Sequence, residues 1–153
     1  MTAAGSIIRA IDGAGEAQVL KDQEQSISSS SWTRIEYQMI AWDDWAYWDD
    51  QENEFVVPPS MGGLYRATLT VTWASNNSGV RMIDITSSAG NVTGLRSDSQ
   101  TTGPFPQNIS DEIRLEPGDT VWAQAYQTSG SDLDVEDNSQ GTMNKFTLTR
   151  IRP

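Results

Sequence analysis

The stretch Leu64–Trp73, LYRATLTVTW, decides the fold class of this chain. Apolar and aromatic side chains alternate in it with arginine and threonine, and a strict period of two is typical of a β-strand with one buried face. The sequence therefore predicts a long central strand in an all-β domain. The residues expected on the buried face of this strand are Tyr65, Ala67, Leu69, Val71 and Trp73.

The residues that follow this strand predict a reversal of the chain. Ser75–Gly79 (SNNSG) is a turn cluster, in which asparagine and glycine supply the positive φ angles of a tight turn. An apolar, β-branched run then resumes at Val80–Thr86 (VRMIDIT). Together, the two runs predict a long antiparallel hairpin at the centre of the domain.

Other strand signals, separated by turn residues, recur along the rest of the chain. We count about eight short strands and no convincing amphipathic helix, a pattern typical of a β-sandwich or a β-barrel. In Thr120–Gln127 (TVWAQAYQ), small residues alternate with larger ones, so either face is a candidate for burial. The other clear signals are Trp32–Ile40, Phe55–Val57, Asp111–Leu115 and Lys145–Ile151.

Composition excludes several classes of function. A chain of 153 residues suits one domain, and its net charge of −11 argues against nucleic acid and anionic membranes as partners. The absence of cysteine and histidine excludes disulfides, Ser-His and Cys-His nucleophiles and imidazole metal ligands. The many acidic residues form no motif with a recognisable catalytic geometry. We therefore predict a protein that is not an enzyme and that uses no cofactor and no metal.

The N-terminal region differs from the rest of the chain. It lacks the basic flank and apolar core of a signal peptide, and no apolar run approaches the length of a membrane span, so we expect a soluble protein folded in a cytoplasm. Residues 1–25 are predicted to be an arm, followed by one β domain at residues 26–153. The arm is either a frayed tail or a segment that lies across a neighbouring subunit, using Ile7, Ile8 and Ile11.

Residues Ala41–Glu54, AWDDWAYWDDQENE, are unusually rich in tryptophan and acidic side chains. The tryptophans of this loop either fold back over the end of the domain, dock onto a protein, or provide a stacking surface for a sugar. A calcium loop of the EF-hand type is not matched, because the glycine that it requires is absent. The candidate contact residues in this loop are Trp42, Trp45 and Trp48.

Several landmarks occur in an order that resembles the jelly rolls of the tumour-necrosis-factor and complement-globular-head type, most closely their small bacteriophage relatives. They are Ser31–Tyr37 (SWTRIEY), Glu54–Ile85, Leu115–Gly130 (LEPGDTVWAQAYQTSG) and Phe146–Ile151 (FTLTRI). The resemblance implies a jelly-roll β-sandwich and a homotrimer packed about a threefold axis. It also implies that aromatic residues line this axis, with Tyr65, Trp122 and Tyr126 as candidates.

The resemblance also implies a structural role. We expect a capsid decoration (cement) protein of a tailed bacteriophage, synthesised in the cytoplasm of the bacterial host and located on the outer capsid surface of the virion. Its partners would be two further copies of itself and the major capsid protein, which the arm and the tryptophan loop would contact. The alternative is a receptor-binding or carbohydrate-binding head of a phage fibre or tail protein, with Trp42, Trp45 and Trp48 as the stacking surface.

Overall fold

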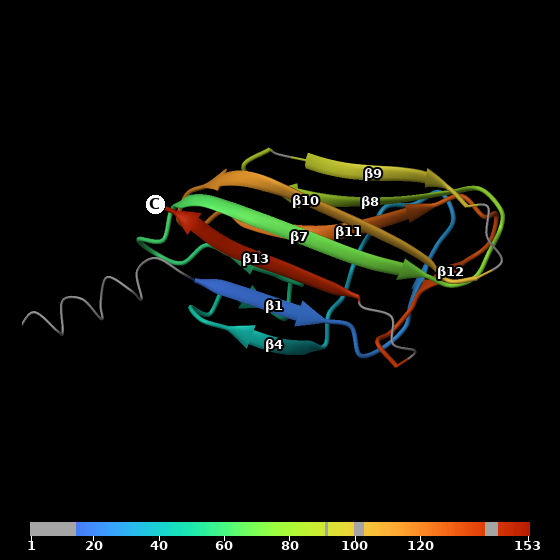
Figure 1. The fold of residues 1–153 in the computed structure, drawn as a ribbon, viewed down its shortest axis with the longest axis horizontal. Coiled ribbons are helices and arrows are strands. Elements are labelled where there is room, and N and C mark those ends of the chain that lie inside the picture. Colours follow the sequence, from blue (N-terminus) through green and yellow to red (C-terminus); the bar gives the residue numbers. More distant parts are fainter. Residues whose placement is uncertain (1–14, 91, 100–102, 140–143) are drawn as a thin grey trace, which may run out of the picture.

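The computed structural model describes residues 15–90, 92–99, 103–139 and 144–153. This part of the chain contains 13 β-strands and no helix, and the strands form two antiparallel sheets packed face to face (Figure 1). The prediction of an all-β sandwich is therefore confirmed.

Each sheet combines strands from distant parts of the sequence. Sheet A contains β1 (Glu16–Leu20), β2 (Gln25–Ile27), β4 (Met39–Asp43), β7 (Gly63–Trp73), β10 (Phe105–Leu115), β12 (Leu133–Val135) and β13 (Lys145–Arg152). Sheet B contains β3 (Thr33–Arg34), β5 (Trp48–Asp49), β6 (Glu54–Val56), β8 (Val80–Ser87), β9 (Val92–Asp98) and β11 (Thr120–Gln127). The order in sheet A runs from β10 through β7, β13 and β1 to β4.

β7 is an interior strand of sheet A, as its sequence predicts. β10 pairs with it from Gly63 to Trp73, while β13 and then β12 pair with its other edge. All five residues expected on its buried face lie in the core. The long, regular alternation therefore identifies the buried face of β7 correctly.

The predicted hairpin between β7 and β8 is wrong. β8 belongs to sheet B, where it lies between β11 and β9. Since both edges of β7 are occupied by other strands, the turn after Trp73 carries the chain from one sheet to the other. The buried Arg81 fixes this crossing, because its guanidinium donates hydrogen bonds to the carbonyl oxygens of Asn76 (3.1 Å) and Ser78 (2.9 Å).

The predicted boundary between arm and domain after residue 25 is also wrong. β1 lies inside sheet A, between β13 and β4, with Ala17 and Val19 in the core. The backbone ladder reaches back to Gly15, whose carbonyl oxygen accepts a hydrogen bond from the Arg150 amide at 2.8 Å. The β domain therefore includes residues 15–25 and does not start at residue 26.

Aromatic side chains connect the two sheets in the core. The ring centroids of Phe146 in sheet A and Phe55 in sheet B lie 4.8 Å apart, and Tyr37 stacks on Phe146 at 6.1 Å. Trp48 meets Phe55 edge to face at 5.1 Å. Because large aromatic residues dominate the burial of apolar surface, this cluster is a main source of the stability of the sandwich.

A charged side chain is buried beside this core. Lys21 follows β1 and donates hydrogen bonds from Nζ to the Glu36 carbonyl oxygen (2.9 Å) and to Gln25 Oε1 (3.2 Å). Burial lowers the pKa of Lys21 to about 8, although the carboxylates of Glu36 and Asp137 oppose this shift. The ammonium group thus fastens the segment between β3 and β4 to the end of β1.

Candidate binding surfaces

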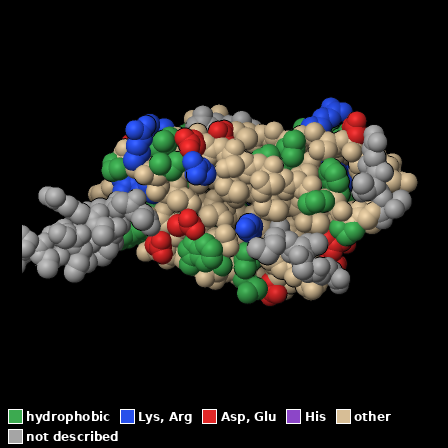
Figure 2. Space-filling model, viewed as in Figure 1, with side chains coloured by type: hydrophobic (Ala, Val, Ile, Leu, Met, Phe, Trp, Pro, Cys, Tyr) green, Lys and Arg blue, Asp and Glu red, His purple; other side chains and the backbone are tan. Residues whose placement is uncertain are grey.

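The outward side chains of β1, β7, β10 and β13 form one broad surface, which we call the sheet A face. Its middle consists mainly of neutral polar residues, and charged side chains lie toward its ends (Figure 2). These polar groups pair across neighbouring strands. Gln18 donates to Thr147 Oγ1 (2.9 Å), Asn108 donates to Thr70 Oγ1 (2.6 Å), and the hydroxyls of Thr68 and Ser110 share a hydrogen bond of 3.0 Å.

The charge of the sheet A face contrasts with that of the whole chain. Of the 21 acidic residues in the chain, only Glu16 and Glu112 point outward on these four strands. The cations Arg66, Arg114 and Lys145 point outward on the same strands, and Arg152 is exposed at the end of β13. Arg66 pairs with Glu112 at 2.7 Å. The sheet A face is therefore close to neutral, although the chain carries a net charge of −11.

The sheet A face is bordered by β4, the outermost strand beside β1. Met39, Ile40 and Trp42 are large apolar residues on this strand, and they are 46%, 55% and 43% exposed. Trp42 keeps one polar contact, a hydrogen bond of 3.0 Å from its indole nitrogen to Glu16 Oε1. An edge strand with exposed apolar residues is a natural place for contact with another protein.

The three tryptophans of the loop that contains β5 occupy three different environments. Trp42 is exposed on β4, Trp48 packs against the aromatic core, and Trp45 lies at one end of the sandwich. The Asp43 carboxylate accepts hydrogen bonds from the amides of Tyr47 (2.8 Å) and Trp48 (2.9 Å), which holds this loop in a tight fold. The predicted residues Trp42, Trp45 and Trp48 therefore do not share one stacking surface.

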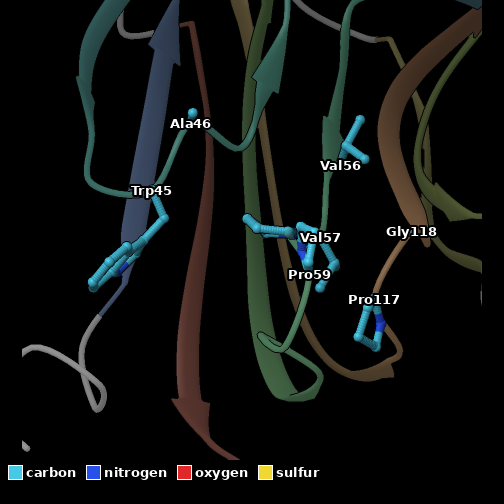
Figure 3. A pocket seen from close by; sticks show the side chains of 8 residues that line it. Trp45, Ala46, Val56, Val57, Pro59, Pro117 and Gly118 are labelled. Atoms are coloured by element: carbon cyan, nitrogen blue, oxygen red, sulfur yellow. The ribbon is translucent and has the colours of Figure 1, made fainter.

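Trp45 forms one wall of an open apolar pocket of about 610 Å³ (Figure 3). Val56, Val57, Pro59 and Pro117 lie opposite it, so valine and proline side chains dominate the lining. Gly15 packs directly against the Trp45 ring, leaving no room there for a Cβ atom. The pocket thus lies at the end of the sandwich where the described chain begins.

The candidate trimer residues do not lie on a common surface. Tyr65 is completely buried in the core, and its hydroxyl donates a hydrogen bond to the Met61 carbonyl oxygen. Trp122 and Tyr126 point away from the core on the outer side of sheet B, because the small Ala123 and Ala125 fill the inward positions of β11. A fully buried Tyr65 has no surface to offer to a partner, and we do not keep it as an interface residue.

Ile7, Ile8 and Ile11 lie outside the described residues. Among the residues that the structure describes, no group of acidic side chains is arranged to hold a metal ion. The same residues contain no helix long and apolar enough to cross a membrane.

The order of strands and the two-sheet packing define a class of fold, the jelly roll of tumour necrosis factor and of complement C1q globular domains. The chain matches the globular domain of zebrafish complement 1qA protein with a TM-score of 0.59, 10% identity and coverage of 88% of this chain and 93% of that one. It matches murine APRIL, in a crystal structure at pH 5.0, with a TM-score of 0.66, 10% identity and coverage of 90% and 98%.

A third solved structure of this fold is Eiger TNF from S. frugiperda, with a TM-score of 0.62, 10% identity and coverage of 90% of this chain and 91% of that one. No model of a protein family and no curated protein matches the sequence. At 10% identity these likenesses establish the fold alone, so the predicted jelly-roll sandwich is confirmed.

Proposed function

We propose that this chain forms a homotrimer that decorates the outer surface of a tailed-bacteriophage capsid, binds the major capsid protein and stabilises the shell. The observation that carries the proposal is the sheet A face, a nearly neutral surface on a strongly acidic chain, bordered by the exposed apolar edge of β4. The bacteriophage origin rests on the sequence landmarks, whereas the likeness to solved structures supports the fold.

Electrostatics favours the sheet A face as the place where copies meet. Two chains of charge −11 repel each other, and the repulsion is weakest where each presents a surface with balanced charges. Covering the outer side of β7 and β13 would also desolvate few charged groups, because threonine side chains occupy the middle of both strands. The face can therefore be buried at a low electrostatic cost.

The β4 edge supplies the apolar part of the proposed contact. If Met39, Ile40 and Trp42 of one subunit lie against the sheet A face of the next, the same contact repeats around a threefold axis and closes a ring. Burial of these three side chains provides the driving force, since each removes a large apolar area from water. The neutral face and the apolar edge then have complementary roles in one interface.

The pocket beside Trp45 is the basis for proposing a second surface, which would contact the capsid. It lies where Gly15 enters the sandwich, so the preceding segment with Ile7, Ile8 and Ile11 is attached next to it. We propose that this segment and the pocket end of the domain face the shell. A trimer offers three such ends, and attachment at several points converts weak single contacts into durable binding.

The alternative, a receptor-binding or carbohydrate-binding head that uses Trp42, Trp45 and Trp48, has less support. Such a head needs aromatic rings on one surface, whereas these rings lie on an edge strand, in an end pocket and against the core. We therefore place the decoration role first.

Molar mass and capsid binding test the proposal in two steps. Light scattering of the full-length protein should give three times the chain mass of 16.8 kDa, and a monomer would contradict the trimer. In co-sedimentation, the protein should pellet with purified undecorated phage heads up to a saturating amount. A trimer that stays in the supernatant would overturn the capsid role.

A variant that lacks residues 1–14 tests the role of the N-terminal segment in this assay, since it keeps every described strand. We expect it to retain the trimer mass and to lose co-sedimentation. If it saturates the heads as the full-length protein does, the proposed role of Ile7, Ile8 and Ile11 is wrong.

A further inference from the structure

The outer side of sheet B carries a group of aromatic and polar side chains that none of the surfaces above includes. We call it the sheet B face. Trp122, Gln124 and Tyr126 point outward in succession along β11. Trp32 and Arg34 join them from the segment of β3, and Asp84 joins them from β8, whose register places it opposite Gln124.

The aromatic part of the sheet B face has two rings at one end and one at the other. Trp32 and Tyr126 lie with their ring centroids 5.2 Å apart and their planes tilted by 38°, and Trp32 is 40% exposed. Trp122 lies four residues from Tyr126 on the same strand, which corresponds to about 13 Å along an extended chain. The Arg34 guanidinium lies 4.5 Å from the Trp122 ring centroid.

A polar pair occupies the space between these rings. Asp84 is 9% exposed, and its carboxylate accepts a hydrogen bond from the Gln124 side chain. Burial raises the pKa of Asp84, and this hydrogen bond opposes the shift. On the other side, Gly94 of β9 lies opposite Asp84, and a Cβ atom at residue 94 would collide with Asp84 Oδ1. β9 therefore leaves room for the carboxylate.

We propose that the sheet B face binds a neutral oligosaccharide, with Trp32, Tyr126 and Trp122 stacking on sugar rings and Asp84 and Gln124 hydrogen-bonding to sugar hydroxyls between them. Aromatic rings offer flat apolar area for the C–H faces of pyranose rings. A carboxylate beside an amide accepts and donates hydrogen bonds within a small space, as adjacent hydroxyls require.

Charge decides between a neutral and an anionic ligand. The chain repels polyanions because its net charge is −11, and Asp84 adds a negative group at the centre of the site. Arg34 does not offset this charge, because it pairs with Glu54 at 3.2 Å and donates to the Glu52 carbonyl oxygen at 2.7 Å. These charges favour a neutral sugar over an acidic polysaccharide or a nucleic acid.

The sheet B face lies on the opposite side of the sandwich from the sheet A face. It would stay open in a trimer that packs through the sheet A face, and sugar binding does not require a capsid. The inference therefore goes beyond the proposed function, and each can fail while the other holds.

Titration calorimetry of the full-length protein tests the inference. The probes are four neutral hexasaccharides (of β-glucose, α-glucose, mannose and xylose) and one anionic probe, a galacturonate hexamer. We expect saturable binding of at least one neutral probe and none of the anionic one. Absence of saturable binding for every neutral probe, or tighter binding of the galacturonate, would overturn the inference.

Single substitutions locate the site. Trp32→Ala and Tyr126→Ala should each weaken binding of the best probe by about tenfold, the scale expected for the loss of a stacked ring. Asn77→Ala is the control, since Asn77 is exposed in the turn after β7 and belongs to none of the surfaces described above, and its affinity should equal that of the parent. An equal loss in Asn77→Ala and Trp32→Ala would contradict a site on the sheet B face.

Asp84→Asn separates ligand binding from folding. The substitution keeps the shape of the side chain and removes a charge that burial disfavours, so the melting temperature should stay the same or rise. Binding should weaken by about tenfold, because a charged acceptor is lost. Unchanged affinity in this variant would show that Asp84 does not contact the sugar.

Discussion

The outer faces of the two sheets enclose one core, yet they differ in chemistry. The sheet A face is built from threonine, serine and amide groups that pair with each other across strands, as Gln18 does with Thr147. The sheet B face presents Trp32, Trp122 and Tyr126 around the hydrogen-bonded pair of Asp84 and Gln124. A surface whose polar groups are paired is easily covered by a flat partner, whereas exposed rings beside a buried carboxylate suit a ligand.

Removal of β1 should have the largest effect on the two faces, because it destroys sheet A and with it the support of both. Deletion of residues 1–25 takes out an interior strand and the core residues Ala17 and Val19, so we expect loss of cooperative folding. Deletion of residues 1–14 should leave the urea midpoint unchanged. Circular dichroism during urea titration measures both. An unaltered midpoint after the longer deletion would contradict the interior position of β1.

Truncation of the aromatic core should destabilise the whole sandwich, which supports both faces, without altering the side chains of either face. Phe146→Ala removes a ring that contacts Phe55 and Tyr37, and such changes destabilise proteins by about 3–5 kcal/mol. Urea titration measures this loss. Trp32→Ala, at an exposed ring, should cost about 1 kcal/mol or less. Similar losses in the two variants would mean that Trp32 is part of the core.

A charge on the sheet A face should break the proposed trimer and leave the sheet B face intact. Ser110 is exposed in the middle of that face beside Thr68, so Ser110→Glu would place an unpaired charge against the apolar β4 edge of the neighbouring subunit. Burial of an unpaired charge costs on the order of several kcal/mol, enough to give monomers at micromolar concentration. Light scattering measures the mass, with Asn77→Glu in an exposed turn as the control. A trimer of Ser110→Glu would place the interface elsewhere.

The smallest expected effect is the change in stability caused by the titration of Lys21, which belongs to neither face. Its pKa is about 8 in the folded chain and 10.5 when exposed, so between these values the unfolded chain binds more protons. Stability should therefore rise with pH from 8 to about 10, by at most about 1.4 kcal/mol per pH unit. Above pH 10 stability should fall again because of the buried tyrosines. Burial raises the pKa of Tyr37 and of Tyr47, so these two side chains ionise in the unfolded chain and stay protonated in the folded one.

The variant Lys21→Met lacks this titrating group, and we expect a flatter stability profile between pH 8 and 10 than in the parent. Urea titrations at several pH values measure the difference. An identical slope in the two proteins would mean that Lys21 keeps an ordinary pKa in the folded chain.

Sequence reasoning succeeded where alternation was long and failed where topology decided the outcome. It identified the buried face of β7 because five core residues recur at a period of two. It missed the interior position of β1, since Ala17 and Val19 alone mark a buried face in a short strand. The residues after Trp73 predict a turn, but they do not indicate to which sheet the next strand belongs.

The candidate sites show the same limit. The tryptophans at positions 42, 45 and 48 are close in sequence, yet the loop held by Asp43 sends them to different environments. The sheet B face joins residues from β3, β8 and β11, which only the register between strands brings together. The sequence shows that Trp122 alternates with Ala123. It does not show that the small residues of this strand face the core.

The position of β1 has a mechanical consequence. Hydrogen bonds to β13 on one edge and to β4 on the other lie across the direction of this strand. A pull applied through Gly15 along β1 therefore loads both ladders in shear, so that many bonds must break at once. If the preceding residues tether the domain to an expanding shell, tension is resisted by the middle of the sheet and not by an edge that peels one bond at a time.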